Sequence, residues 1–206
     1  MEIIVVGGGA AGMMAAVSAA KEGAAVTILE KNEKLGKKVY ITGKGRCNVT
    51  NACDRDSFFA HICRNPRFLY SAFGKFSNDD MMAFVEAHGT ALKTERGLRV
   101  FPASNHASDV LKALRLALDE AGVGIVTGAE VKKLLIKDGA VTGVVCTVMG
   151  AEGKPRRQTF PADRVIVATG GLSYPGTGST GDGYRFAEAA GHSLTPRMPS
   201  LVPLNA

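Results

Sequence analysis

The hydrophobic pattern at the start of the chain predicts a βαβ unit. Residues 3–6 form a short apolar run that ends at a glycine, which is typical of a buried parallel strand. Residues 10–21 then place alanine and methionine on most faces of a helix, and Gly23 provides its C-terminal stop. A second buried strand is predicted over residues 25–29, and Glu30 follows it directly.

The pattern after this unit is less regular. Residues 32–57 show no apolar period, so we expect a long loop there. Short helices are predicted over 57–63 and 66–76, and Ser77 begins a helix that reaches His88. The remaining predicted elements are strands at 98–101, 124–127, 131–136, 140–148 and 164–168, a hairpin turn at 137–139, and helices at 109–121 and 183–190. This order predicts an α/β fold with a parallel sheet, helices and a β-meander.

Composition narrows the class of protein. Of the 206 residues, 46% are apolar and 21% are charged, which is typical of a folded soluble domain. The length allows one sizeable domain, or one domain and the start of another. The net charge of +6 suits an anionic ligand, but the cations are spread along the chain and are not interleaved with aromatic residues. We therefore expect no nucleic-acid partner.

The four cysteines show neither a C-x-x-C motif nor a paired metal-ligand spacing. The sequence therefore predicts no metal site, no disulfide framework and a reduced, cytoplasmic protein. Residues 3–20 are rich in apolar side chains, but Glu2 stands where a signal peptide has cations, and three glycines divide the stretch. Secretion and membrane spanning are therefore not expected.

The glycine motif Gly7-x-Gly9-x-x-Gly12 lies between the first strand and the first helix. Gly7 allows a tight turn, Gly9 lets the backbone approach a pyrophosphate, and Gly12 lets the helix pack closely on the strand. The N–H groups and the positive end of the helix would hold the phosphates. Glu30 would accept hydrogen bonds from a ribose and repel a 2′-phosphate, which favours FAD or NAD over NADP.

A second match to the same motif, Gly176-x-Gly178-x-x-Gly181, has a different context. The nearest apolar strand ends at residue 168, and two glycines and Pro175 lie between that strand and the motif. No strand feeds this turn, so we interpret it as a loop and not as an independent nucleotide site.

The loop over residues 31–51 favours FAD over NAD. A nicotinamide enzyme usually repeats the βαβ unit promptly, whereas this loop could run beneath a longer cofactor. Its cations (Lys37, Lys38, Lys44 and Arg46) could balance phosphate charge, and Asn48 and Thr50 could hydrogen-bond a ribityl chain or flavin edge. The alternative is a solvated surface loop.

Five segments together resemble the HI0933-like (YhiN-like) flavoprotein family, which is related to FAD-dependent oxidoreductases with a glutathione-reductase-type Rossmann domain. They are VVGGGAAGMMAA, LEKNEKLGKKVYITGKGRCNVTN, FPASNHASDVLKAL, VIVATGGLSYPGTGSTGDGYRFAEAAGHS and PSLVPL. They occur in this order and cover essentially the whole chain. The most specific are GRCN-x-TN and ATGG-x-S-x-P-x-TGS-x-GDGY.

The resemblance implies how FAD would be held. The glycine turn and Glu30 would bind its pyrophosphate and ribose, and the loop of residues 45–48 would follow the flavin side. The Val131 backbone would contact the adenine end, and residues 168–171 would close over the cofactor. The implied cofactor-binding residues are Gly7, Gly9, Ala11, Gly12, Glu30, Lys31, Lys38, Gly45, Arg46, Cys47, Asn48, Val131, Thr169, Gly170, Gly171 and Asp182.

The resemblance also implies a domain organisation. Family members are considerably longer, because an inserted β-rich domain interrupts the FAD-binding domain. Residues 1–195 would form the N-terminal portion of the FAD-binding domain, and residues 196–206 would begin the insertion. We expect the sequence to be an N-terminal fragment with an incomplete flavin site and no activity of its own.

A flavin carries its own redox chemistry, and the sequence assigns no catalytic residue. Cys47 could be a redox nucleophile if Arg46 lowered its pKa, although a buried or merely polar cysteine is the commoner case. Two hypotheses remain. The first is an FAD-dependent oxidoreductase that uses a reduced nicotinamide, NAD(P)H, to reduce a small organic substrate. The second is a non-catalytic module that binds NAD or FAD.

Overall fold

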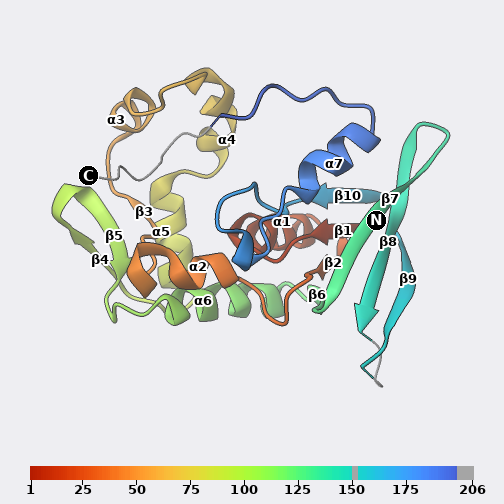
Figure 1. Ribbon diagram of the computed structural model, residues 1–206. Helices are drawn as coiled ribbons and strands as arrows, with labels where there is room; N and C mark the ends of the chain where they lie inside the picture. Colours follow the sequence, from red (N-terminus) through yellow and green to blue (C-terminus); the bar gives the residue numbers. More distant parts are fainter. Residues whose placement is uncertain (150–152, 199–206) are drawn as a thin grey trace, which may run out of the picture.

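The computed structural model describes residues 1–149 and 153–198, and its centre is a four-stranded parallel sheet (Figure 1). The strand order is β10-β1-β2-β6. The strands are β1 (Glu2–Val6), β2 (Ala25–Leu29), β6 (Gly124–Val126) and β10 (Arg164–Val167). The predicted βαβ unit is confirmed, since α1 (Ala10–Lys21) connects β1 to β2. The predicted Rossmann-type fold is therefore present.

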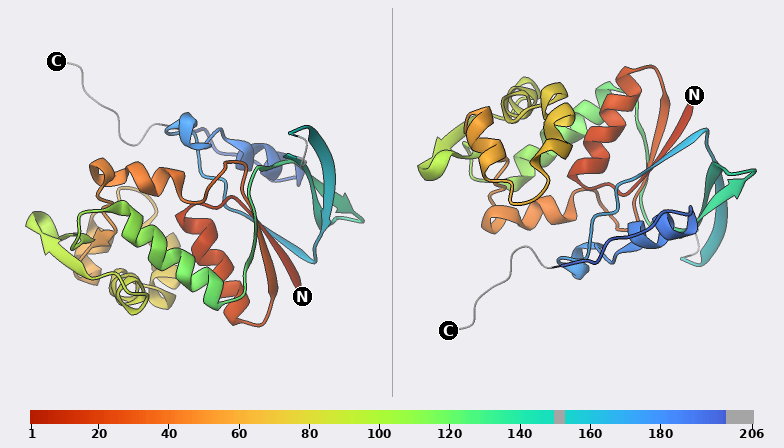
Figure 2. Two further views of the ribbon diagram at one scale, coloured as in Figure 1. Left: turned by 90° about the horizontal axis from the view of Figure 1, so that it is seen from below. Right: turned by 90° about the horizontal axis from the view of Figure 1, so that it is seen from above.

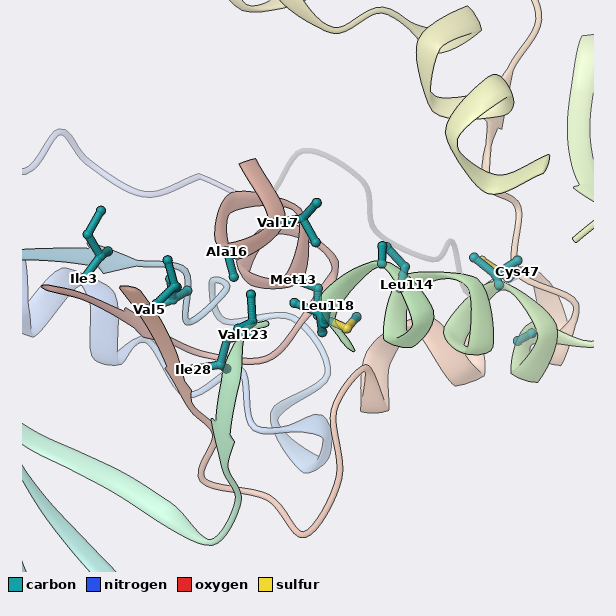
Figure 3. Packing of buried hydrophobic residues seen from close by; sticks show 14 residues of the cluster. Ile3, Val5, Met13, Ala16, Val17, Ile28, Cys47, Leu114, Leu118 and Val123 are labelled. Atoms are coloured by element: carbon teal, nitrogen blue, oxygen red, sulfur yellow. The ribbon is translucent and has the colours of Figure 1, made fainter. Parts of the chain in front are cut away.

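The parallel sheet lies between two other layers, which explains why its strands are continuous apolar runs in the sequence (Figure 2). One face of the parallel sheet packs on α1 and α6 (Ala107–Glu120). The other face packs on an antiparallel sheet and α7 (Asp182–Ala189). Alternate residues of β1 therefore enter two different cores, and each buried aliphatic side chain contributes roughly 1.5–3 kcal/mol. Figure 3 shows the cluster on the α1 and α6 side, with Cys47 at one end.

The antiparallel sheet is the predicted meander, with one strand reassigned. It contains β7 (Ala129–Lys137), β8 (Ala140–Met149) and β9 (Pro155–Pro161), in that order. The 124–127 run belongs instead to the parallel sheet as β6, because it pairs with β2. The predicted hairpin between β7 and β8 is confirmed, with Asp138 and Gly139 both at positive φ. Strand β9 was not predicted, because its arginines and flanking prolines hide the alternation.

A second region lies beside the three layers and corrects the predicted long loop over 32–57. Five residues are too few to show a helical period, so the short helices there escaped prediction. Its elements are α2 (Lys37–Ile41), η1 (Thr42–Gly45), β3 (Thr50–Asn51), α3 (Arg55–Ala60), η2 (Pro66–Leu69), α4 (Tyr70–Lys75), α5 (Asn78–Ala87), β4 (Leu92–Glu95), η3 (Arg96–Leu98) and β5 (Arg99–Pro102). Strands β3, β5 and β4 form a small antiparallel sheet.

Local sequence signals explain the ends of several elements in this region. Ser77 and Asp80 form a reciprocal capping box at the start of α5, which confirms the predicted helix start. Helix α2 begins after Gly36, whose N–H donates to the Gly8 carbonyl at 2.8 Å. A Cβ on Gly36 would overlap the Leu111 side chain of α6, so glycine lets α2 approach the core.

Two other predictions concern the limits of the chain. None of the helices within residues 1–149 and 153–198 is long and apolar enough to cross a membrane. Most of the predicted start of an inserted domain, residues 196–206, falls outside the described residues.

Candidate functional site

A cavity of about 770 Å³ opens at the carboxyl ends of β1, β2 and β10. Strand β2 pairs with one side of β1, and β10 pairs with the other side. The order in which successive strands are added across the sheet therefore reverses beside β1. Such a switch point is the usual ligand position in open α/β sheets. The cavity brings together most of the predicted cofactor-binding residues: Gly7, Gly9, Ala11, Glu30, Lys31, Lys38, Cys47, Asn48, Val131, Thr169, Gly170, Gly171 and Asp182.

The first glycine turn has the geometry that its sequence predicts. Gly7 has φ +105°, and a Cβ there would lie 2.6 Å from the Ala168 carbonyl oxygen. A Cβ on Gly12 would overlap the Gly7 carbonyl oxygen, so this glycine sets the distance between α1 and the strand end. A Cβ on Gly9, by contrast, would meet no atom within 4 Å. Packing within the protein explains two of the glycines, whereas only the space in front of α1 explains Gly9.

The N-terminus of α1 is open to an anion. Gly9 is the N-cap residue, so no side chain caps the helix, and its first turn contains no acidic residue. The first N–H groups of a helix have no partners within the helix, and they carry the positive end of its dipole. Together with the free space at Gly9, this arrangement fits a diphosphate.

Glu30 is a buried carboxylate held in place by three hydrogen bonds. Its side chain accepts from the Gly8 N–H, from the Asn32 N–H and from Asn32 Nδ2, each at 2.7 Å. The residue is 7% exposed and lies in the cavity wall. A carboxylate has about four acceptor positions, so it can still accept from a ribose hydroxyl. Its charge also opposes a 2′-phosphate at this place.

Two lysines join the segment after β2 to the second glycine motif, which lies 135 or more residues further along the chain. Lys31 Nζ donates to Thr180 Oγ1 at 2.7 Å and to Asp182 Oδ2 at 2.8 Å. Lys38 Nζ donates to the Ser173 carbonyl oxygen and to Ser179 Oγ, both at 2.7 Å. We call residues 173–181 the clasp loop. Both lysines were predicted to contact the cofactor, and the structure shows that they also hold one wall of the cavity.

The clasp loop confirms the interpretation of the second motif as a loop. It contains η4 (Pro175–Thr177), and no strand leads into it. Gly178 has φ +97°, and a Cβ there would lie 2.7 Å from Asn32 Nδ2. This glycine therefore lets the loop approach the segment after β2 closely.

Asp182 directly follows the clasp loop and is the acidic partner of Lys31. Although desolvation opposes its ionisation, hydrogen bonds from Lys31 and Thr180 hold the pKa of this carboxyl below its ordinary value. The Lys31–Asp182 ion pair is partly buried, with the two side chains 25% and 23% exposed.

The loop of residues 45–48 is divided between two places. Cys47 and Asn48 line the cavity, but Gly45 and Arg46 do not. Arg46 instead makes an ion pair with Glu95 at 2.7 Å and lies over the Phe101 ring, 4.0 Å from its centroid. Its guanidinium, as the main cause, holds the pKa of Glu95 below the ordinary value. The structure therefore ties Arg46 to the β4–β5 sheet.

Cys47 is not activated in the way its sequence neighbour indicated. It is 5% exposed, and burial raises the pKa of its thiol, with a smaller opposing contribution from the Thr42 hydroxyl. The hypothesis that Arg46 lowers this pKa is wrong, because Arg46 is engaged by Glu95. Cys47 instead supplies an apolar wall between the cavity and the core.

Asn48 also has partners within the protein. With its side-chain amide oriented so that the nitrogen faces these oxygens, Asn48 donates to the carbonyl oxygens of Val100 at 3.2 Å and of Thr50 at 3.0 Å. Thr50 is part of β3 and pairs with Val100. These contacts show that residues 48–50 are fixed by the small sheet, which argues against a solvated surface loop.

Sequence reasoning missed the apolar end of the cavity. Beyond Cys47, the wall is formed by five apolar side chains from α2, α5, α6 and the segment before β3. They are Val39, Val49, Met81, Val110 and Leu114. The only signal in the sequence is helical spacing on α6, which is the ordinary signature of a core face. The pattern could therefore not separate cavity lining from packing.

No group of three or more metal-ligating side chains occurs within residues 1–149 and 153–198. The described cysteines are all free thiols.

Solved structures of other proteins have a similar fold. Mycobacterium smegmatis Sdh1 in complex with UQ1 has a TM-score of 0.68 at 20% identity, covering 92% of this chain and 38% of that one. A 3-ketosteroid-delta4-(5alpha)-dehydrogenase from Rhodococcus jostii RHA1 has a TM-score of 0.64 at 19% identity, covering 84% of this chain and 47% of that one. At these identities, the likeness shows the fold alone.

Two curated relatives are more similar in sequence. The chain is 38% identical to a 3-dehydro-bile acid delta(4,6)-reductase from Clostridium scindens, over 97% of this chain and 46% of that protein. It is 32% identical to a ribosomal RNA dihydrouridine synthase from Haemophilus influenzae, over 98% of this chain and 48% of that protein. The chain thus spans about half the length of the curated relatives it matches. The second name leaves the predicted exclusion of nucleic acid without support.

The family model described as the HI0933-like protein Rossmann domain matches residues 1–198. This match covers nearly the whole chain and agrees with the sheet order, the first glycine turn and the buried acid after β2. The chain therefore belongs to the HI0933-like family.

Proposed function

We propose that this chain is the FAD-binding part of a flavin-dependent reductase. The observation that carries the proposal is the cavity in front of α1, where an uncapped helix N-terminus, the open Gly9 and the buried Glu30 carboxylate meet. The glycine turn would bind the pyrophosphate, Glu30 would accept from a ribose, and the Val131 backbone would face the adenine. When bound, the flavin supplies the electron transfer.

The shape of the cavity supports FAD over a nicotinamide dinucleotide. The cavity reaches from Val131 on β7, past Gly9, to Cys47 and Asn48 before β3. Its far end is apolar, and a flavin ring is a larger apolar body than a nicotinamide. Residues 169–171 and residues 177–179 of the clasp loop form a further part of the cavity wall.

The relatives' names guide the proposal for the chemistry. One is named as a delta(4,6)-reductase and the other as a dihydrouridine synthase, and both names describe hydrogen added to a carbon–carbon double bond. We therefore propose that NAD(P)H is the electron donor and that the acceptor is a small organic substrate with such a bond. The buried neutral thiol of Cys47 would shape the pocket and would not act as a nucleophile.

The proposal includes a division into domains. Residues 1–195 would belong to the FAD-binding domain, and residues 196–206 would lead into an inserted β-rich domain. The chain spans about half the length of its curated relatives, which supports this organisation.

A pair of glycine variants tests the proposal. Gly9 and Gly176 both leave free space around a Cβ, and both belong to a G-x-G-x-x-G motif, but only Gly9 lines the cavity. Gly9→Val should abolish the flavin absorbance retained through purification, and Gly176→Val should leave it unchanged. Equal flavin content in both variants would contradict the assignment. Reoxidation of bound flavin after titration with NADH or NADPH, with and without an enone, would separate a reductase from a non-catalytic module.

A second candidate is reduction of a uracil ring in RNA. The identity to ribosomal RNA dihydrouridine synthases from two organisms, 32% in both cases, favours it. The structure adds a surface on which cations and aromatic rings are interspersed, contrary to the sequence interpretation. The segment of residues 55–75, which forms α3, η2 and α4, contains three arginines, one lysine and five aromatic residues.

A further inference from the structure

The helices α3, η2 and α4 form a surface outside both hydrophobic clusters. None of the three elements contains a buried residue. The exposed aromatic Phe68 stands out on this surface, because it is 85% exposed. The views agree that these helices lie beyond α1 and α5, away from the antiparallel sheet of β7, β8 and β9 (Figures 1 and 2).

The other aromatic rings of this surface stabilise one another. The Phe58 and Phe73 rings have centroids 4.4 Å apart, as do the Phe59 and Tyr70 rings. The Arg55 guanidinium lies 5.8 Å from the centroids of Phe59 and Tyr70. Among the ring contacts of residues 1–149 and 153–198, none includes Phe68. The cluster therefore forms a base from which a single free ring projects.

A rigid turn holds Phe68 in this position. Asn65 adopts a left-handed conformation with φ 52°, and Pro66 begins η2. The Phe68 N–H donates to the Asn65 carbonyl oxygen at 3.1 Å, which closes the turn. Asn65, Pro66, Arg67 and Phe68 together line a surface hollow of about 490 Å³. An amide, a guanidinium and a free ring thus surround one small depression.

Three cations lie along the segment that contains the hollow. Arg64 and Arg67 flank it in sequence, and Lys75 ends α4. In the part of the chain that the structure describes, none of these three cations has an ion-pair partner. Unpaired cations beside an exposed ring suit a polyanion that also carries flat apolar groups.

We propose that this surface docks single-stranded RNA, with one base stacked on Phe68 and neighbouring phosphates on Arg64 and Arg67. The Asn65 amide offers a donor and an acceptor to the edge of the stacked base. The identity of the ligand rests on the RNA candidate of the proposed function, whereas the surface lies apart from the cofactor cavity. An apolar protein partner would leave the three cations without counter-charges, which is why RNA is favoured.

Binding of a fluorescently labelled oligouridine to the protein, followed by anisotropy, tests the proposal. Phe68→Ala should weaken binding about tenfold, because stacking on an aromatic ring is worth one to two such factors in affinity. The matched control Tyr40→Ala removes another exposed aromatic ring, 51% exposed and not part of the cavity lining, and it should leave binding unchanged.

Charge reversal provides a second, independent readout. The double variant Arg64→Glu/Arg67→Glu should reduce the slope of log affinity against log salt by about 1.4, since each lost phosphate contact on a single strand removes about 0.7. The control Arg156→Glu/Arg157→Glu makes the same charge change on β9 and should keep the slope of the unmodified protein. Circular dichroism spectra would confirm that all variants are folded.

Three results would overturn the proposal: no RNA binding by the unmodified protein, equal losses in the test and control variants, or self-association that Phe68→Ala abolishes. The last would identify the surface as a contact between copies of the chain. Flavin content measured on the same samples keeps the two proposals separate. RNA binding that depends on Phe68 in samples without flavin would contradict only the proposed cofactor.

Discussion

The two glycine motifs have the same sequence pattern, but they differ in which glycine is free of close contacts within the protein. In the first motif, the first and third glycines are crowded by the protein, and the second faces open space. In the second motif, Gly176 is the open position, and Gly178 and Gly181 are crowded. The open Gly9 lines the cavity, whereas the open Gly176 does not. A glycine that the protein itself does not require indicates a ligand only where it faces a cavity.

The difference follows from what leads into each turn. Strand β1 leads directly into the first motif, which ends in the first turn of α1, so the backbone of this motif faces the cavity. The second motif has no strand before it, and Lys31 and Lys38 hold it from outside. Its crowded glycines allow close approach to Asn32 and to Leu172. The first motif therefore leaves an open backbone surface in the cavity, and the second forms part of the cavity wall.

The largest expected effect comes from Gly12→Ala. Its Cβ would overlap the Gly7 carbonyl oxygen, and a backbone atom at the end of a central strand cannot move away easily. We expect a loss of about 3 kcal/mol or more in the free energy of unfolding, measured by urea denaturation. The control is Gly176→Ala, where a Cβ meets no atom within 4 Å, and its stability should stay within about 0.5 kcal/mol of the unmodified protein. Similar losses in both variants would show that the two turns are equally constrained.

The sequence predicted the first turn well because each of its constraints is local. Glycine spacing, the apolar strand and Glu30 all lie within 30 residues. The partners of Lys31, Lys38 and Arg46 could not be predicted, because a long flexible cation shows no period and its acceptors are distant in the chain. A buried Cys47 was the commoner case expected from the sequence, but the elements that bury it could not be predicted, because burial is a tertiary effect.

Glu30→Gln should have the next largest effect. The carboxylate accepts three hydrogen bonds at the first turn, and a glutamine amide has only one acceptor oxygen. Its NH₂ group would face a donor in a buried position, so we expect a loss of about 2 kcal/mol in the free energy of unfolding. Asn32→Ala removes one of the same hydrogen bonds from a part-buried side chain, together with its hydrogen bond to the Thr177 carbonyl oxygen at 3.2 Å, and serves as the control, with a loss of about 1 kcal/mol. If Glu30→Gln were as stable as the unmodified protein, this acid would not organise the turn.

The smallest expected effect concerns the Lys31–Asp182 ion pair beside the clasp loop, and this effect depends on pH. The pKa of Asp182 in the folded protein lies below its ordinary value of 3.8, so the carboxylate stabilises the fold at pH above that value. This contribution is lost as the pH falls through the folded-state pKa. Asp182→Asn should therefore cost about 1 kcal/mol at pH 7, a modest amount because the Lys31–Asp182 pair is only partly buried.

The difference between Asp182→Asn and the unmodified protein should stay constant from pH 7 to about 5 and narrow as the pH falls below 3.8 and through the folded-state pKa, because the unmodified carboxyl becomes protonated first in the unfolded and then in the folded protein. Urea denaturation at several pH values measures it, and the subtraction removes the contributions of the other acids. The control is Asp119→Asn, which breaks the exposed Arg115–Asp119 pair on α6 and should give a difference near zero at every pH. A constant, pH-independent difference for Asp182→Asn would mean that the hydrogen bond to Thr180 matters and the charge does not. The clasp loop would then be held by hydrogen bonds that do not depend on the charge of Asp182.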